Sequence, residues 1–221
     1  MIQAIIFDMD DVIVNSSGLH FQAYDKAMRD FGVSSPDIPD DMRIKIYGMR
    51  IREIMEMLAR HFKMNVDVDE LTNHRNAYFN KLVAGGVSAM PGLHTLVERI
   101  RGAGFKRAVA SSGLREYVLE VLRQLKIDDF FEHVVTGEDV KEPKPSPESF
   151  LLAARKLGMK PKDCAVIEDS TNGLLAAKGA GMLAIGVKNP IIDSRQDMSP
   201  ADIVVGRLDE ITIEMLLSSV D

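Results

Sequence analysis

The sequence has little cysteine, no tryptophan, no excess of basic residues and no long apolar run. Its single cysteine, Cys164, cannot form an intrachain disulfide, which argues against a disulfide-stabilised secreted domain and indicates a reducing cytoplasm. The formal net charge of −6 over 221 residues argues against a general binder of nucleic acid or of anionic membranes, because such proteins need a basic face.

No apolar stretch comes near the roughly 20 residues that a membrane-spanning helix needs. The short apolar run before Asp8 is not a signal peptide, since it has neither the basic start nor the small-residue cleavage site of one. We therefore expect a soluble, cytoplasmic protein, a monomer or weak homodimer, that binds neither nucleic acid nor membrane.

What the sequence does contain is the composition of an ordinary globular protein, with 46% hydrophobic and 27% charged residues. Short apolar runs of strand length recur along it, at residues 4–7, 108–110, 133–135, 165–167, 183–187 and 203–205. Stretches of helical periodicity lie between most of them, among them residues 114–125, 148–157 and 173–180. This alternation predicts an α/β fold with a doubly wound, Rossmann-like parallel sheet covered on both faces.

One interval, from about residue 16 to residue 86, breaks the alternation. It has no comparable apolar run, but it has three segments of helical periodicity, at residues 19–31, 50–62 and 69–82. A helical insert explains this interval better than a very long loop. We therefore predict a catalytic α/β core of residues 1–15 and 87–221 and a small helical cap domain of residues 16–86, with hinges at 14–16 and 84–86.

Polar side chains follow four of the predicted strands. In open parallel sheets ligands bind beyond the carboxyl ends of the strands, so these side chains are expected to meet at one edge. In chain order they are Asp8, Asp10, Ser111, Ser112, Lys144, Glu168 and Asp169.

The four acids of this set point to a cation. A spacing of two places Asp8 and Asp10 on the same side of an extended chain, although an Asp-x-Asp alone is equally at home in a turn or a helix cap. Four clustered carboxylates repel one another unless a cation intervenes. A hard ion with oxygen ligands is therefore expected, and Mg²⁺ fits best.

Two further segments are suited to binding an anion. Ser111, Ser112 and Gly113 precede a predicted helix, where they can cap the helix, form an anion site at its positive end, or do both. Lys144 lies in a loop with three prolines within five residues, which is stiff enough to hold an ammonium over an anion. The alternative for this loop is a solvated turn with a proline-led helix start.

Together these segments resemble the motifs of the haloacid dehalogenase-like hydrolases. The four motifs are matched, in order, by residues 7–16 (FDMDDVIVNS), 109–112 (VASS), 144–148 (KPSPE), and 166–173 (VIEDSTNG) followed by 176–182 (AAKGAGM). They span nearly the whole chain, and the predicted helical insert lies where the phosphatase and β-phosphoglucomutase branch of this family has its cap domain.

The resemblance implies that Asp8 is the nucleophile that forms an aspartyl-phosphate. Asp10 would protonate the leaving oxygen and then deprotonate the attacking water. Ser111, with Ser112 beside it, and Lys144 would bind the phosphoryl oxygens. Dehalogenase members lack the second aspartate of the first motif, so Asp10 favours phosphoryl transfer over dehalogenation.

The resemblance also implies how Mg²⁺ would be held. Its ligands would be Asp8, the backbone carbonyl of Asp10, and Asp169. Glu168 would be a further ligand or would accept a hydrogen bond from a metal-bound water.

Two positions depart from the usual motif. Members of this branch commonly have glycine where Asp11 stands and aspartate where Asn15 stands. Asp11 places a side chain and a negative charge beside the nucleophile, where they can alter the loop, the metal site or the rate. Neither change removes a group that the chemistry needs.

The predicted cap supplies candidates for substrate binding. The segment from Ser16 resembles the start of the cap in this branch, and within it His20 either orients Asp10 or contacts substrate, or is an ordinary helix histidine. Guanidinium groups suit phosphates and hydroxyls. Three arginines are therefore candidates for binding the remote part of the substrate: Arg50, Arg52 and Arg75. The alternative is that they lie on the solvated face of a helix.

The leading hypothesis is therefore an Mg²⁺-dependent phosphatase that hydrolyses a small phosphorylated metabolite, with a sugar phosphate favoured because a small cap excludes bulky protein substrates. A β-phosphoglucomutase would use the same residues and return the phosphoryl group to the sugar. A third hypothesis, from another class, is a catalytically weakened module in which Asp11 spoils the loop and the cleft only binds a phosphometabolite.

Overall fold

The computed structural model describes residues 1–47, 49–188 and 196–218, and the parts of the predicted core and cap at the other positions lie outside the described residues. The core is a parallel sheet with the strand order β3-β2-β1-β4-β5-β6. Its strands are β1 (Ala4–Phe7), β2 (Lys106–Ala110), β3 (His133–Val135), β4 (Cys164–Glu168), β5 (Leu183–Val187) and β6 (Ile203–Val205). The predicted α/β parallel sheet is thus confirmed.

Strand β1 lies inside the sheet, between β2 and β4. All its residues are buried, and Phe7 pairs with Val109 of β2 and with Ile167 of β4. One residue further along, this register brings Asp8 level with Ala110 and Glu168. The segments that follow these three strands therefore leave the sheet side by side at one edge.

Helices cover both faces of the sheet. Side chains alternate along a strand, so Ile5 and Phe7 pack in one apolar cluster with helices α5 (Leu93–Arg101) and α6 (Arg115–Gln124). Ala4 and Ile6 pack on the other face with α7 (Glu148–Leu157) and α8 (Thr171–Gly179). The short helix α9 (Ile213–Ser218) completes the described chain, within which no helix is both long and apolar enough to cross a membrane.

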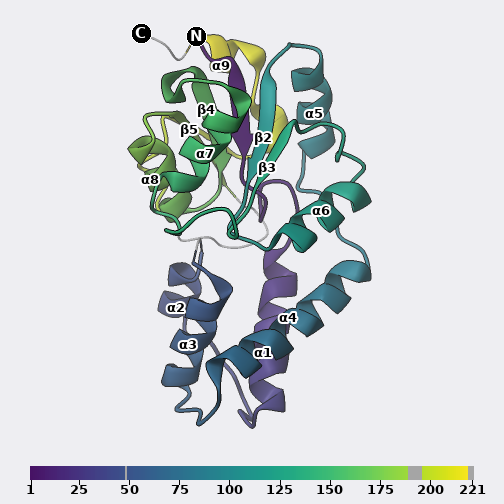
Figure 1. The fold of residues 1–221 in the computed structure, drawn as a ribbon, viewed down its shortest axis with the longest axis vertical. Helices are drawn as coiled ribbons and strands as arrows, with labels where there is room; N and C mark the ends of the chain where they lie inside the picture. Colours follow the sequence, from purple (N-terminus) through teal and green to yellow (C-terminus); the bar gives the residue numbers. More distant parts are fainter. Residues whose placement is uncertain (48, 189–195, 219–221) are drawn as a thin grey trace.

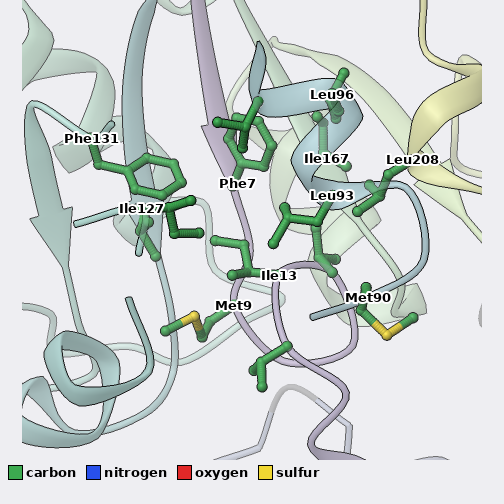
Figure 2. Packing of buried hydrophobic residues seen from close by; sticks show 14 of the residues in the cluster. Phe7, Met9, Ile13, Met90, Leu93, Leu96, Ile127, Phe131, Ile167 and Leu208 are labelled. Atoms are coloured by element: carbon green, nitrogen blue, oxygen red, sulfur yellow. The ribbon is translucent and has the colours of Figure 1, made fainter. Parts of the chain in front are cut away.

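The loop after β1 is anchored in the first of these clusters. Met9 and Ile13 are completely buried there and lie near Phe7, as Figure 2 shows. Met9 lies between Asp8 and Asp10 in the sequence and Ile13 lies just after the acids, so their burial fixes the backbone from which Asp8 and Asp10 project.

A second unit, made of helices, lies at the carboxyl end of the strands (Figure 1). Its helices are α1 (Ser17–Asp30), α2 (Asp40–Lys45), α3 (Ile51–His61) and α4 (Val68–Ala84). They share an apolar cluster of their own, built around side chains such as Met55 and Leu58. Three of these helices match the predicted segments, whereas α2 was not predicted, because a helix of six residues is too short to show a helical period. The domain boundaries at 15/16 and 86/87 stay a prediction.

The two connections between core and helical unit run side by side. The backbone N–H of Asn15 donates to the carbonyl of Ser88 at 2.9 Å, and Val14 forms a β-bridge with Ala89. The first predicted hinge, 14–16, thus lies against residues 88 and 89, which come just after the second predicted hinge, 84–86. Within that second segment Gly86 has a φ of +113°, which glycine adopts readily.

Candidate active site

A pocket lies between the carboxyl edge of the sheet and the helical unit, and residues of both line it. It contains about 920 Å³ of space free of atoms, part of it open to solvent. The predicted strand-end residues that line it are Asp8, Asp10, Ser112, Lys144, Glu168 and Asp169. Ser111 lies behind this lining, where its buried hydroxyl accepts a 3.0 Å hydrogen bond from the N–H of Gly113 in the turn that leads into α6.

Asp8 follows β1 and is held on one side only. Its Oδ1 accepts a 2.5 Å hydrogen bond from Nζ of Lys144, while Oδ2 has no hydrogen-bond partner among the described residues. Burial raises the pKa of this carboxyl to about 8; Lys144 acts against the rise, whereas Glu168 and Asp10 add to it. One oxygen of Asp8 is thus oriented and the other is free to react.

Lys144 is the cation of the acidic cluster. Its Nζ also donates to Oε1 of Glu168 at 2.7 Å, and its side chain is only 3% exposed. Burial disfavours the charged ammonium, but Asp8 and Glu168 outweigh that effect and raise the pKa of Lys144 above its ordinary value. The lysine therefore stays charged at the bottom of the pocket.

Glu168 uses both carboxylate oxygens within the protein. While Oε1 binds Lys144, Oε2 accepts the N–H of Ser170 at 2.7 Å and its hydroxyl at 2.9 Å. A Cβ on Gly173 would lie 1.7 Å from Oε1, so only glycine leaves room for this carboxylate. These contacts fit the role of a residue that positions Lys144 and the start of α8.

Asp169 has the opposite character. It is 4% exposed and makes no hydrogen bond or ion pair with any described residue. Burial, reinforced by the charges of Glu168, Asp11 and Asp8, raises its pKa well above the usual range. A buried carboxylate without a protein donor is a strong indication of a bound cation.

These three acids fit a hard cation. One oxygen each from Asp8, Glu168 and Asp169 lies within 4.8 Å of the others. The donors are all carboxylate oxygens, which divalent cations such as Mg²⁺ prefer. Burial, with the repulsion between these acids added to it, raises the pKa values of Asp8 and Asp169, and a cation would counter both effects. The carboxylate of Asp10 is not part of this group, and the expectation that Asp10 contributes its backbone carbonyl stays a prediction.

The carboxylate of Asp10 is instead fixed by three donors on a single oxygen. Its Oδ1 receives hydrogen bonds from the hydroxyls of Ser16 (2.6 Å) and Tyr117 (2.5 Å) and lies 3.2 Å from Nε2 of His20. Burial alone would raise the pKa of Asp10, but these groups, His20 foremost, lower it to about 2. Its Oδ2 has no hydrogen-bond partner in the described part of the chain, so this oxygen is available to a substrate.

The contacts of Ser16 and Tyr117 with Asp10 were not predicted from the sequence. His20 was predicted either to orient Asp10 or to contact substrate, and the structure brings it to Asp10. Tyr117 was missed, because it lies in a periodic helical segment where an aromatic residue indicates packing. Ser16 was noted as the end of the first motif, as part of a hinge and as the start of the cap, but not as a partner of Asp10.

Arg75 is the one predicted cap arginine that lines the pocket. It is 1% exposed, its guanidinium lies over the rings of Tyr24 and Phe79, and its Nη2 contacts Nδ1 of His20. Since a guanidinium can only donate, Nδ1 accepts and Nε2–H is left to face Asp10. Arg75 thereby sets the tautomer of His20.

The other two arginines lie outside the pocket lining. Arg50 donates from the cap to the backbone carbonyls of Val140 (3.0 Å) and Lys141 (2.5 Å), and so ties the cap to the loop that carries Lys144. Arg52 is 57% exposed and pairs with Asp69 at 2.7 Å. We therefore leave Arg52 out of the proposed substrate site.

Asp11 replaces the expected glycine without changing the backbone that glycine favours. Its φ is +56°, in the left-handed region that aspartate tolerates better than most residues. Its Oδ1 accepts the N–H groups of Ser16 and Ser17, each at 3.2 Å, and its Oδ2 accepts the hydroxyl of Ser17. The carboxylate therefore caps the first turn of α1 and connects the loop after β1 to the helical unit.

Substitutions at Asp11 should separate the effect of the capping carboxylate from the effect of the left-handed backbone. Asp11→Gly loses the cap, whereas Asp11→Ala loses the cap and is also strained at positive φ, so both variants should be less stable than the parent. We expect Asp11→Ala to be about 1–2 kcal/mol less stable than Asp11→Gly. Urea unfolding measures the difference, and equal stability of the two variants would contradict the left-handed backbone.

Known proteins resemble the chain in sequence and in structure. A family described as haloacid dehalogenase-like hydrolases matches residues 5–187. The β-phosphoglucomutase of Bacillus subtilis is 32% identical over 97% of this chain and 93% of its own length. A phosphorylated carbohydrates phosphatase of Thermotoga maritima is 28% identical over 95% of this chain and 96% of its own. The crystal structure of a β-phosphoglucomutase from Clostridium difficile matches with a TM-score of 0.86 and 25% identity, covering 99% of this chain and 96% of that one.

Proposed function

The chain belongs to the haloacid dehalogenase-like hydrolase family and is a phosphatase of that family, and we propose that it removes phosphate from a small phosphorylated metabolite, a sugar phosphate, by way of a phosphoryl group on Asp8. One observation carries this proposal. Asp8 and Asp10 line one pocket, and each has one oxygen bound by protein donors and the other free of them among the described residues.

Asp8 and Asp10 have different roles in the proposed reaction. Oδ2 of Asp8 attacks phosphorus, the bond to the leaving oxygen breaks, and Asp10 gives that oxygen a proton from Oδ2. Asp10, now ionised, takes a proton from a water that attacks the phosphoryl group on Asp8. Phosphate leaves, Asp8 regains its carboxylate, and the proton remains on Asp10 for the next turnover.

Lys144 and the turn after β2 are suited to the charge of the transferring group. Lys144 is a buried, fixed cation bound to the other oxygen of the attacking carboxylate, and charge of this kind stabilises phosphoryl oxygens most strongly where water is excluded. Ser112 and Gly113 line the same pocket, close to the start of α6. Ser111 contributes by bracing this turn from behind.

We further propose that Asp8, the carbonyl of Asp10 and Asp169 hold Mg²⁺, with Glu168 beside them. The ion would supply charge neutralisation for the phosphoryl oxygens. From the protein's own groups alone, Asp8 has its pKa raised to about 8 and Asp10 has its pKa lowered to about 2, the reverse of what a nucleophile and an acid need. A cation beside Asp8 favours its ionised form, and the anionic substrate raises the pKa of Asp10.

Thermal unfolding tests the cation site without activity. In the folded protein the raised pKa keeps Asp8 protonated up to about pH 8, whereas in the unfolded chain Asp8 loses its proton above about pH 4. Without a bound cation, the free energy of unfolding therefore falls as the pH rises from about 4 towards 8. Mg²⁺ binds the ionised form, so its stabilising effect should be larger at pH 8 than at pH 6. At 100 times its dissociation constant it should contribute about 2.7 kcal/mol, or roughly 5–10 °C in a chain of this size.

The matched control for this measurement is Asp169→Asn, which removes the acid that has no protein donor. The variant should fold and should lose most of the Mg²⁺-dependent shift at pH 8. An equal shift in the parent and the variant would contradict the proposed site.

A substrate panel tests the function itself. Phosphate release from several sugar phosphates, with Mg²⁺ and with a chelator, should be dependent on the cation and absent in Asp8→Asn. No release from any member would overturn the proposal. The 32% identity with a β-phosphoglucomutase favours a second candidate, in which the phosphoryl group returns to the sugar. Isomerisation of β-glucose 1-phosphate in the presence of a bisphosphate primer would identify that activity.

A further inference from the structure

The wall that the cap presents to the pocket is largely apolar. Five side chains, here called the apolar wall, come from α1, from the segment between α2 and α3, and from α3: Phe21, Ile46, Met49, Ile51 and Ile54. Each is also part of the apolar cluster of the cap or packs against it. The pocket thus joins a charged floor in the core to an edge of the cap's own hydrophobic interior.

Several polar groups on the cap side of the pocket already have partners in the protein. The hydroxyl of Ser17 binds Asp11, and His20 binds Asp10 and Arg75. The side-chain amide of Asn80, which also lines the pocket, has no hydrogen-bond partner among the described residues. The apolar wall itself offers no partner to a hydroxyl, so a leaving group rich in hydroxyls that lay against it would lose bonds to water at a cost in free energy.

Two features of the remaining lining point to a ring. Leu114 lines the pocket from the core and is 50% exposed, so an apolar ligand face would cover it. Arg75, which also lines the pocket, has a buried Nε–H without an acceptor among the described residues. The lining therefore offers apolar contact area, with the unpaired and buried Nε–H of Arg75 beside it.

From these observations we propose that the leaving group of the substrate ends in a flat heteroaromatic ring, as in a nucleoside 5′-monophosphate, and that the ring rests on the apolar wall. The inference rests on the proposed function and narrows its substrate class to a sugar phosphate that carries a base. A heteroaromatic ring combines apolar faces for the wall with acceptor atoms at its edge.

The test compares substrates that share a phosphorylated ribose and differ in the ring. Phosphate release is measured with ribose 5-phosphate, uridine 5′-monophosphate and adenosine 5′-monophosphate in the presence of Mg²⁺. We expect kcat/KM to be at least tenfold higher for one or both nucleotides. If ribose 5-phosphate is turned over as well as or better than both, the inference is overturned while the phosphatase proposal stands. If neither these nor other sugar phosphates release phosphate, the proposed function fails and the inference fails with it.

Variants of two methionines test whether the ring contacts the apolar wall. Met49 belongs to the apolar wall, whereas Met57 packs on the same cap cluster with similar partial exposure and does not line the pocket. Met49→Ser should lower the ratio of kcat/KM between nucleotide and ribose 5-phosphate at least fivefold, and Met57→Ser should leave the ratio unchanged. Equal ratios in both variants and the parent would show that the ring does not contact the wall.

Discussion

Asp8→Asn is expected to lower phosphate release about 10⁴-fold or more while the protein stays folded. The amide keeps the hydrogen-bonding shape of the carboxylate but cannot form the bond to phosphorus. Among the neighbouring acids, Asp10 has one oxygen bound by three donors, Glu168 uses both oxygens in the protein, and Asp169 is the proposed ligand of Mg²⁺. A phosphate-release assay with the best sugar phosphate of the panel measures the loss.

The stability of the same variant separates loss of chemistry from loss of fold. Burial opposes the ionised form of Asp8 and raises its pKa to about 8, so removing the charge should leave the melting temperature unchanged or raise it. The control is Asp69→Asn, which removes an exposed carboxylate paired only with the exposed Arg52, and it should retain full activity. Residual activity of Asp8→Asn within tenfold of the parent would contradict the assignment of the nucleophile.

The core was predictable because its signals are local and short. Strand β1 is four consecutive buried apolar residues followed at once by acids, and the central strands of a parallel sheet repeat this pattern. The polar groups that follow β1, β2 and β4 could be placed at one edge from topology alone, without knowledge of any contact. The roles assigned to them stay predictions, since geometry brings groups together without demonstrating what they do.

What could not be predicted depends on contacts that only the folded arrangement of the elements creates. Tyr117 reaches Asp10 only because α6 packs beside the loop after β1. Arg50 is bound to the loop of Lys144 rather than free for substrate, and neither partner is visible in the sequence around it. Likewise, the capping role of Asp11 requires the start of α1 to turn back over the loop.

The second large effect is expected for Lys144→Met. Methionine fills the volume of the lysine but leaves Asp8 and Glu168 buried without a protein cation. Breaking a buried ion pair in this way costs about 3–5 kcal/mol, and loss of a fixed charge beside the transferring phosphoryl group should lower kcat about 10²–10³-fold. Urea unfolding in a chelator and the phosphate-release assay measure the two losses.

A double variant shows whether the stability loss comes from the unpaired acids. Adding Glu168→Gln to Lys144→Met removes one buried charge and leaves the amide oxygen to accept from Ser170. The double variant should be more stable than the single one, with a coupling of about 0.5–3 kcal/mol, and its activity should not recover. Lys81→Met, at an exposed position of α4, is the control and should change neither quantity. If the single and double variants unfold at the same urea concentration, the charge of Glu168 is not what Lys144 stabilises, and the lysine acts through Asp8 alone.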